Sequence, residues 1–429
     1  MKAKKNNMQK FDVLIVGGGM VGLTLALAIR KQTQLTVAIV DIAPPAELTE
    51  QPDVRVSALN IASKQIFDNL DVWPLIEQQR IQPYTDMHVW DKAGFGKLHF
   101  SHNDLHQNSA SEQLGWIIEN SVIRSSLWQK AQADHGITFY TENTLSNISI
   151  GEGEAFISFE SNNSNPMPIT AKLVVGADGA NSWVRRQMDM PLTFRDYDHH
   201  AIVATVKCSQ GHQNTAWQVF LETGPLALLP LEGCEGKQDL CSIVWSTSPE
   251  DAVRLNGLTP EEFSKELTAA SDGKLGNIEL QSKLFSHPLT MRMAQTFVQE
   301  RIALIGDAAH TIHPLAGQGV NLGLLDAVSL AQMISDKISG QNATNDTWLT
   351  ARLLNEYSRW RKAEAAEMIT AMESIKQIFT PQQGAVKLVR GIGLSLIDNF
   401  KPVKQTLIKQ ALGLKGDLPK LAQFKDKLI

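Results

Sequence analysis

Three glycines near the N-terminus form the first pattern in the chain that could do chemistry. Gly17, Gly19 and Gly22 fit G-x-G-x-x-G between an apolar strand pattern and an apolar helix pattern. In such a unit the first glycine makes a tight turn, the second admits a pyrophosphate, and the third lets the helix pack closely on the strand. Asp41 ends the next apolar run, where an acidic side chain can bind ribose hydroxyls. The pattern predicts a dinucleotide site and leaves the choice between NAD and FAD open.

A longer stretch, residues 301–323, joins an apolar strand pattern to a glycine-studded loop and a helix. Its strand stops at Asp307, whose carboxylate can hold a polyol hydroxyl. Gly317 and Gly319 let the backbone approach a flat or anionic group. The helix expected to begin near Val320 adds free N–H groups and a partial positive charge. These parts suit a cofactor with a sugar-like chain and a ring that becomes negative on reduction, which describes a flavin better than a nicotinamide.

Asp178 ends a third apolar run, residues 172–176, and a helix start follows it. Taken alone, Asp178 and Gly179 would make an ordinary tight turn. Together with the other two motifs, they indicate a part of the same cofactor site. The chain has no second G-x-G-x-x-G, so the sequence provides no resident site for a nicotinamide.

Strand and helix patterns alternate around these motifs, as their positioning requires. We predict that a strand at 35–40 completes the dinucleotide unit and that a strand at 284–291 returns to it. A second sheet is expected from strands at 87–100, 199–206, 217–221, 225–231 and 240–247. Helices are expected at 259–271, 324–339 and 347–379. The uncharged run 224–231 is either a core strand or a wall of an apolar substrate site.

The composition is that of an ordinary globular protein of two or three packed units. With 429 residues, a net charge of -5 and a pI of about 6.1, the chain gives no reason to expect a nucleic-acid partner. Its three cysteines have no C-x-x-C spacing, which argues for a reducing cytosol. His102 and His106 lie in a polar loop without carboxylate context, so no metal site is predicted. The apolar run 13–29 is not interpreted as a signal peptide, because Asp12 precedes it and four glycines interrupt it.

Residues 306–323, GDAAHTIHPLAGQGVNLG, resemble the second flavin motif of the p-hydroxybenzoate-hydroxylase-like FAD monooxygenases. More narrowly, they are similar to the ubiquinone-biosynthesis hydroxylases, the UbiH/UbiF/VisC family. The resemblance covers nearly the whole chain. The segments most similar to the 2-octaprenylphenol hydroxylase branch (UbiI/VisC type) are 181–186, 191–200, 241–246 and 410–414.

The resemblance implies an α/β fold in which a Rossmann-type FAD domain contains an inserted β-sheet substrate domain. The FAD-binding domain would consist of segments 1–80, 113–188 and 287–345. The substrate domain would consist of segments 81–112 and 189–286. Residues 346–429 would form a C-terminal helical region that associates with a membrane or a partner.

The resemblance also assigns residues to the cofactor, FAD, and to NAD(P)H as co-substrate. An arginine matching Arg55 faces the cofactor phosphates and the flavin re-face. A polar residue matching Asn120 lies against the flavin, although Asn120 could equally cap its helix. Asp178 would lie between FAD and the visiting NAD(P)H. The remaining expected cofactor contacts are Asp307, Gly319, Val320 and Asn321.

No protein side chain is assigned as a certain catalyst, because the flavin carries the chemistry. The candidates that we name are His313, Pro314, Gly317 and Gln318. Residues 314–319 and the helix start that follows are expected to stabilise negative charge on the reduced flavin. His310 and His313 are the nearest bases that could ionise a phenol, and structural roles are favoured for both.

The implied reaction is hydroxylation of a polyprenylphenol ring in ubiquinone biosynthesis, at C5, with NAD(P)H and O2 and through a flavin C4a-hydroperoxide. One alternative is a sibling hydroxylase that acts at another ring position. Others are a flavin-dependent epoxidase or reductase of a lipid and, from a different class, a non-catalytic flavin-bearing membrane scaffold.

Residues 380–429 shift in composition, with nine Lys and Arg against three Asp and apolar residues between them. A basic amphipathic helix of this kind either lies on an anionic membrane surface or packs on the domain. We therefore predict a cytoplasmic protein, with peripheral contact at the inner face of the cytoplasmic membrane as the open alternative. A homo-oligomer and a complex with other ubiquinone-pathway proteins are further expectations.

Overall fold

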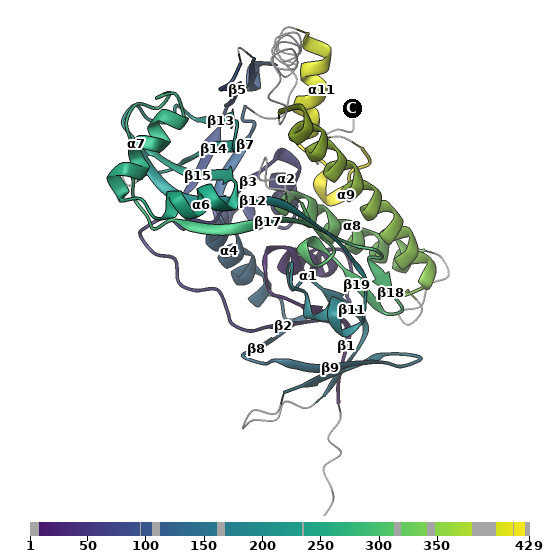
Figure 1. Cartoon of the computed structure of the whole chain (residues 1–429). Coiled ribbons are helices and arrows are strands. Elements are labelled where there is room, and N and C mark those ends of the chain that lie inside the picture. The colour runs from purple at the N-terminus through teal and green to yellow at the C-terminus, as the bar shows by residue number, and fades with distance from the viewer. Residues whose placement is uncertain are drawn as a thin grey trace, which may run out of the picture.

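The computed structural model describes residues 8–94, 96–104, 112–160, 168–233, 236–312, 319–340, 348–379, 400–414 and 416–424. This part of the chain folds into two large β-sheets, a small connecting sheet and the helices around them (Figure 1). The first large sheet forms the lower part of the molecule in Figure 1, and the second lies above it beside helices α6 (Pro249–Asn256) and α7 (Pro260–Ala270).

The first sheet is mostly parallel and places strands from distant parts of the chain side by side. Its strands, in spatial order, are β18 (Val298–Gln299), β19 (Ile302–Leu304), β11 (Ile169–Gly176), β1 (Gln9–Val16), β2 (Val37–Asp41) and β8 (Ile137–Thr141). The hairpin of β9 (Leu145–Ile150) and β10 (Ala155–Phe159) extends it beside β11. Residues 13–16 of β1 are all buried, as expected for a parallel strand that is covered on both faces.

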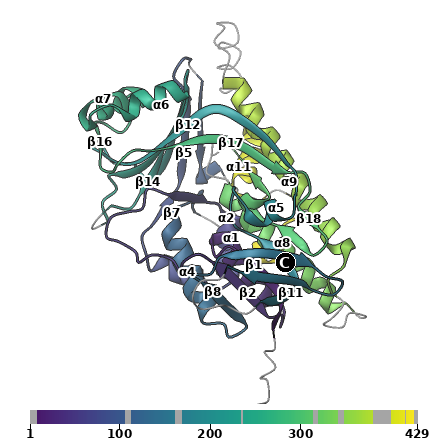
Figure 2. The same cartoon turned by 60° about the horizontal axis from the view of Figure 1, so that its bottom comes forward.

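Helices α4 (Asn120–Gln132), α1 (Met20–Gln32), α8 (Gly319–Ser339) and α9 (Ala351–Phe379) follow one another in space, each in contact with the next (Figure 2). Gly323 makes the close approach of α8 possible, because a Cβ there would lie 2.8 Å from a methyl of Val21 and 3.1 Å from the Cα of Gly306. This packing brings the start of α8 against the start of α1.

The second sheet contains all the strands that we predicted for it. Its strands, in spatial order, are β20 (His310–Thr311), β17 (Phe285–Ala294), β12 (Leu192–Cys208), β15 (Leu240–Thr247), β14 (Gly224–Leu231), β13 (Thr215–Leu221), β5 (Asp86–Asp91) and β6 (Lys97–Ser101), with β16 (Ile278–Leu280) beside β12. Helix α7 begins with a capping box, in which Thr259 and Glu262 bond each other's backbone N–H groups, so the helix predicted at 259–271 is confirmed.

The prediction that the strand at 284–291 returns to the first sheet is wrong. β17 pairs antiparallel with β12 from Leu192↔Ala294 to Val203↔Phe285 and belongs to the second sheet. Local alternation of apolar residues identifies a strand but not its partner, and here the partner lies about ninety residues earlier in the chain.

Strand β14, which has no charged residue, contributes side chains to two apolar clusters. Leu226 and Leu228 are fully buried under α6 and α7, whereas Leu231 packs with Ala58 and Ile117. The last two residues belong to the small connecting sheet of β3 (Val56–Leu59), β7 (Gly115–Glu119) and β4 (Ile81–Tyr84). One face of β14 therefore belongs to the core under α6 and α7, and its C-terminal end joins the second sheet to the connecting sheet. The short helices α2 (Ile61–Asn69), α3 (Trp73–Glu77) and α5 (Trp183–Gln187) complete the first domain.

The described C-terminal residues pack on the domain. In α11 (Lys401–Ala411), Ile408 is buried and Lys404 forms an ion pair with Asp104 at 2.9 Å. Further on, Asn69 donates to the carbonyl of Leu421. Phe400 and Leu407 remain exposed, at 59% and 38%. Residues 380–399 lie outside the described residues. In the described residues no helix is both long and apolar enough to cross a membrane.

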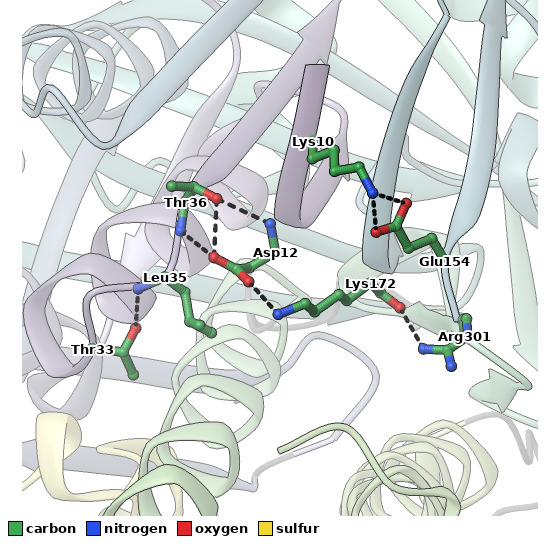
Figure 3. A network of polar contacts seen from close by, with 8 residues as sticks. All are labelled: Lys10, Asp12, Thr33, Leu35, Thr36, Glu154, Lys172 and Arg301. Atoms are coloured by element: carbon green, nitrogen blue, oxygen red, sulfur yellow. Dashed lines mark hydrogen bonds and ion pairs between the residues drawn. The ribbon is translucent and has the colours of Figure 1, made fainter. Parts of the chain in front are cut away.

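A polar network holds the edge of the first sheet at which its parallel strands begin (Figure 3). Asp12 accepts from the backbone N–H of Thr36 at 2.9 Å and pairs with Lys172 at 3.0 Å, so it joins β1, β2 and β11. Arg301 donates to the carbonyl of Lys172 at 3.2 Å. The network thus ties together the beginnings of three neighbouring parallel strands and the residue that precedes β19.

Candidate flavin site

The three sequence motifs meet at the edge of the first sheet where its parallel strands end. Strands β19, β11, β1 and β2 are neighbours in that order, and all pair in parallel. Asp307, Asp178 and Gly17 follow the ends of β19, β11 and β1, and Asp41 is the last residue of β2. Neighbouring strands lie about 4.8 Å apart, so this row is about 15 Å long. Such an edge, where connections leave in both directions from β1, is where α/β sheets bind extended dinucleotides.

The glycine turn after β1 leaves space at the N-terminus of α1. Gly17 has φ +109°, and a Cβ there would lie 2.4 Å from the carbonyl oxygen of Ala177. A Cβ on Gly22 would lie 2.0 Å from the carbonyl oxygen of Gly17, so only glycine lets α1 start this close to β1. At Gly19, the N-cap of α1, a Cβ would meet nothing within 4 Å. A pyrophosphate fits this open space and would receive hydrogen bonds from the first turn of α1.

Asp41 and Arg124 hold the glycine turn from the β2 side. The Asp41 Oδ2 accepts from the backbone N–H of Gly18 at 2.6 Å. Arg124, on α4, donates to the carbonyl of Gly18 at 2.9 Å and to that of Ala43 at 2.7 Å. Asp41 also accepts from Arg124 at 3.3 Å and from the backbone N–H groups of Ile42 and Ala43, at 2.6 and 3.4 Å. These bonds fix the carboxylate at the end of β2, the position at which this kind of unit binds a ribose. The sequence did not reveal the part played by Arg124, because a single arginine inside a helix gives no local signal.

Arg55 and Asn120 come together across the connecting sheet. The backbone N–H of Asn120 donates to the carbonyl of Arg55 at 2.9 Å, and its Oδ1 accepts from the hydroxyl of Ser57 at 2.6 Å. The N-cap of α4 is Glu119 rather than Asn120, so the alternative reading of Asn120 as a helix cap is wrong. The Arg55 side chain is exposed.

Asp178 combines a structural bond with an unused acceptor. Its Oδ2 accepts from the backbone N–H groups of Trp183 and Val184, at 2.6 and 3.0 Å, and so holds the first turn of α5, whose N-cap is Ser182. Its Oδ1 is buried and has no partner among the described residues. A buried oxygen in this state fits a hydroxyl of a bound cofactor or of its reductant. Nearby, Arg185 ties the β11 loop to the β19 loop by donating to the carbonyls of Ala180 and Ala308.

Asp307 follows Gly306 (φ +57°) in the turn after β19. Its side chain is exposed on one side, but the protein around the carboxyl disfavours its charge, and this desolvation raises the pKa of Asp307. His310 is buried and pairs with Asp326 at 2.6 Å. The structural role favoured for His310 is therefore the one observed, and it is not an accessible base.

The start of α8 presents an open position and a structural link. A Cβ on Gly319 would meet nothing within 4 Å, so the first turn near Val320 is accessible to a ligand. The Asn321 side chain instead binds the protein, with its Oδ1 accepting from Asn60 N–H and Ser63 Oγ and its Nδ2 donating to the carbonyl of Ala58. The candidates His313, Pro314, Gly317 and Gln318 lie outside the described residues.

These features fit FAD. The open Gly19 position at the start of α1 suits the pyrophosphate, Asp41 the ribose, Asp307 the ribityl chain, and the start of α8 the ring. Within the described ranges, no group of three or more His, Cys, Asp or Glu side chains could hold a metal ion.

Comparison with known proteins agrees with this site. The family described as "FAD binding domain" matches residues 10–372. The p-nitrophenol 4-monooxygenase PnpA of Pseudomonas putida DLL-E4 superposes with a TM-score of 0.75 and 17% identity, covering 96% of this chain and 100% of PnpA. The fold is therefore that of the p-hydroxybenzoate-hydroxylase-like FAD monooxygenases, and the matched family is one that binds FAD.

Proteins with similar sequences identify the family within this class to which the chain belongs. The 3-demethoxyubiquinol 3-hydroxylase of Escherichia coli (strain K12) is 32% identical, over 95% of this chain and 99% of the relative. The ubiquinone biosynthesis monooxygenase COQ6 of Dictyostelium discoideum is 29% identical, over 94% and 91%. The chain belongs to the FAD-dependent ubiquinone-biosynthesis hydroxylases, the UbiH/UbiF/VisC family. Its cofactor is FAD, and NAD(P)H is the co-substrate typical of the family.

Proposed function

We propose that this enzyme hydroxylates the aromatic ring of a polyprenylphenol in ubiquinone biosynthesis, at C5. The observation that carries the proposal is the row of Asp307, Asp178, Gly17 and Asp41 along one sheet edge, in a chain whose relatives are ubiquinone hydroxylases. FAD held at this site would supply the redox chemistry that takes electrons from NAD(P)H and activates O2.

The chain's own residues bind and orient the cofactor. The first turn of α1, opened by Gly19, holds the pyrophosphate. Asp307 receives the ribityl hydroxyls, and the first turn of α8 at Gly319 and Val320 places positive partial charge near the reduced ring. Asp178 contributes its unpaired Oδ1 on the side where NAD(P)H enters. Arg55, just before β3, and Asn120, just after β7, would face the ring.

We place the substrate ring next to an apolar cluster that joins the second sheet to the connecting sheet. The cluster of Ala58, Ile117 and Leu231 lies where β14 meets the connecting sheet that also carries Arg55 and Asn120. Such surroundings suit a lipid-linked phenol and keep water from the reacting atoms.

Intermediate profiling by mass spectrometry tests the substrate. Cells that lack the protein should accumulate a polyprenylphenol without the C5 hydroxyl, and a plasmid copy should restore the profile. Purified enzyme with FAD, NAD(P)H and 18O2 should place one 18O atom in the ring hydroxyl. An unchanged quinone profile in cells without a redundant hydroxylase, together with no 18O in the phenol, would refute the proposal.

A second ring position is a specific alternative, because one of the relatives is named for 3-hydroxylation of demethoxyubiquinol. In that case the deleted strain would accumulate a later intermediate that already carries the C5 hydroxyl. The same experiment therefore separates the two reactions.

We also propose that α11 contacts an anionic membrane surface from which the substrate is taken. Exposed Phe400 and Leu407 and the exposed Lys409 provide the apolar and basic groups. Phe400→Ser and Leu407→Ser should each weaken binding to phosphatidylglycerol vesicles, whereas Val253→Ser, an exposed apolar control on α6, should not. Equal vesicle binding by all variants would refute this part. Assembly with other pathway proteins or with a second copy would appear as a larger complex in cell extracts.

A further inference from the structure

A buried charged network lies behind the turn that carries Asp307. The Asp326 carboxylate, on α8, accepts from three elements: Arg361 Nε at 2.7 Å, the backbone N–H of Gly306 at 2.9 Å, and His310 Nε2 at 2.6 Å. The side chains of Asp326, His310 and Arg361 are 0%, 1% and 2% exposed.

Helix α9 supplies two of the contacts to this region. Arg361 reaches Asp326, and Tyr357, one helical turn earlier, donates its hydroxyl to the carbonyl of Leu304 at 3.1 Å. Leu304 is the last residue of β19, and Gly306 opens the turn that follows. The helix therefore fixes the strand end directly and the turn through Asp326.

Stability alone does not explain this network. Moving charges out of water is costly, and well-packed apolar side chains of similar volume are often at least as stabilising. Burial opposes the charge of Asp326, but His310 and Arg361 together hold the pKa of Asp326 below its ordinary value. A fixed carboxylate can do what apolar packing cannot: it accepts the Gly306 N–H in one direction, at a residue whose φ of +57° sets the orientation of the turn.

We propose that Asp326 and Arg361 are positioning residues for the cofactor. Asp326 orients the Gly306 turn so that Asp307 faces the flavin's polyol chain, and Arg361 keeps Asp326 charged and aimed at Gly306. His310 contributes a further hydrogen bond to the Asp326 carboxylate. None of these three residues touches the cofactor in this arrangement, and their effect passes through the backbone of the turn.

Titration of purified apoprotein with FAD tests the proposal. Arg361→Met removes the charge, and Arg361→Lys restores it without the planar fork. Arg352→Met is the matched control, because Arg352 lies on the same helix, is 89% exposed and pairs only with Glu356 in the described residues. We expect Arg361→Met to raise the dissociation constant of FAD about tenfold or more relative to Arg352→Met, and Arg361→Lys to recover part of the loss.

Two further readouts separate positioning from general stability. The visible absorption and circular dichroism of bound flavin should change in Asp326→Asn, because the turn against the ribityl chain reorients. Tyr357→Phe should lower the melting temperature but leave the flavin spectrum as it is in the wild type, because Tyr357 holds the strand and not the turn. If Arg361→Met does not fold, Arg361→Lys and Asp326→Asn carry the test.

Folded variants at Arg361 and Asp326 whose FAD affinity and flavin spectrum match those of the control would overturn the proposal. The same result follows if Arg361→Lys binds FAD as weakly as Arg361→Met while melting like the wild type, because charge at this position would then be irrelevant.

Discussion

Replacing Asn321 by alanine should destabilise the apoprotein more than it weakens FAD binding. The Asn321 side chain is buried, and its hydrogen bonds include three with Asn60 N–H, Ser63 Oγ and the carbonyl of Ala58. These bonds tie the first turn of α8 to β3 and α2. The family resemblance assigns this residue to the cofactor, so the variant distinguishes two different roles.

The size of the effect follows from the hydrogen bonds. Each contributes about 1 kcal/mol net, so the loss is about 3 kcal/mol. An unfolding entropy of about 2.1 cal/mol/K per residue, over a chain of this length, converts that loss to a fall of about 3 °C in melting temperature. FAD binding should weaken less than about tenfold, because no bond from the side chain to the cofactor is lost.

The assay is thermal unfolding of apoprotein followed by circular dichroism, together with FAD titration by flavin fluorescence. Asn256→Ala, at an exposed asparagine in the second domain, is the control for a generic amide loss. If Asn321→Ala apoprotein melts like this control while its FAD dissociation constant rises more than about tenfold, the reasoning is wrong and Asn321 contacts the cofactor.

Three more changes test the site. Gly22→Ala should give folded protein that purifies with little FAD, because its Cβ would lie 2.0 Å from the Gly17 carbonyl and must displace the turn; FAD content per chain measures this. Arg124→Met should weaken FAD binding about tenfold with little change in apoprotein melting, since Arg124 is partly exposed and bonds the glycine turn; wild-type affinity would count against it. Asp307→Asn should make apoprotein more stable than wild type at neutral pH. Desolvation raises the folded pKa of Asp307, so its stability contribution is present at low pH and is lost as pH rises through that value. Melting temperatures of the two proteins should converge toward pH 4, and a constant difference across pH would contradict this sign.

Local sequence patterns were sufficient for the glycine turn and the strand ends. Gly17 needs a positive φ, and Gly22 needs a missing Cβ, and both requirements are visible in G-x-G-x-x-G. The order of the strands was not visible, because β1 pairs with β11 and β11 with β19 across more than a hundred residues of chain. For the same reason β17 was placed in the wrong sheet.

The charged residues that hold the site were also missed. Arg124, Arg361 and Asp326 each lie inside a helix, where a single charge looks like a solvent-facing residue. Only their burial and partners, set by the packing of α4, α8 and α9, distinguish them. Asn321, in contrast, was singled out by its motif as a cofactor contact, which stays a prediction, whereas the bonds of its side chain to Asn60, Ser63 and Ala58 were not visible in the sequence.

Helix α9 contacts both the region behind the Asp307 turn and the second sheet. Its 29 residues make a rod of about 43 Å, which runs along one side of the molecule (Figure 1). In its first half, Arg361 bonds Asp326, which in turn accepts from the backbone N–H of Gly306. Toward its end, Glu373 pairs with Arg195 of the second sheet at 2.9 Å and Met372 packs on Phe220.

Because α9 is bonded at two places along its length, a displacement at one of these contacts is transmitted to the other. If the second sheet closes on a substrate, α9 carries that movement to the turn that holds the flavin. By thermodynamic reciprocity, a substrate that tightens FAD binding is itself bound more tightly by the FAD-loaded protein. The contacts of α9 would thus couple the two sites through the protein, in addition to the direct approach of the substrate to the flavin.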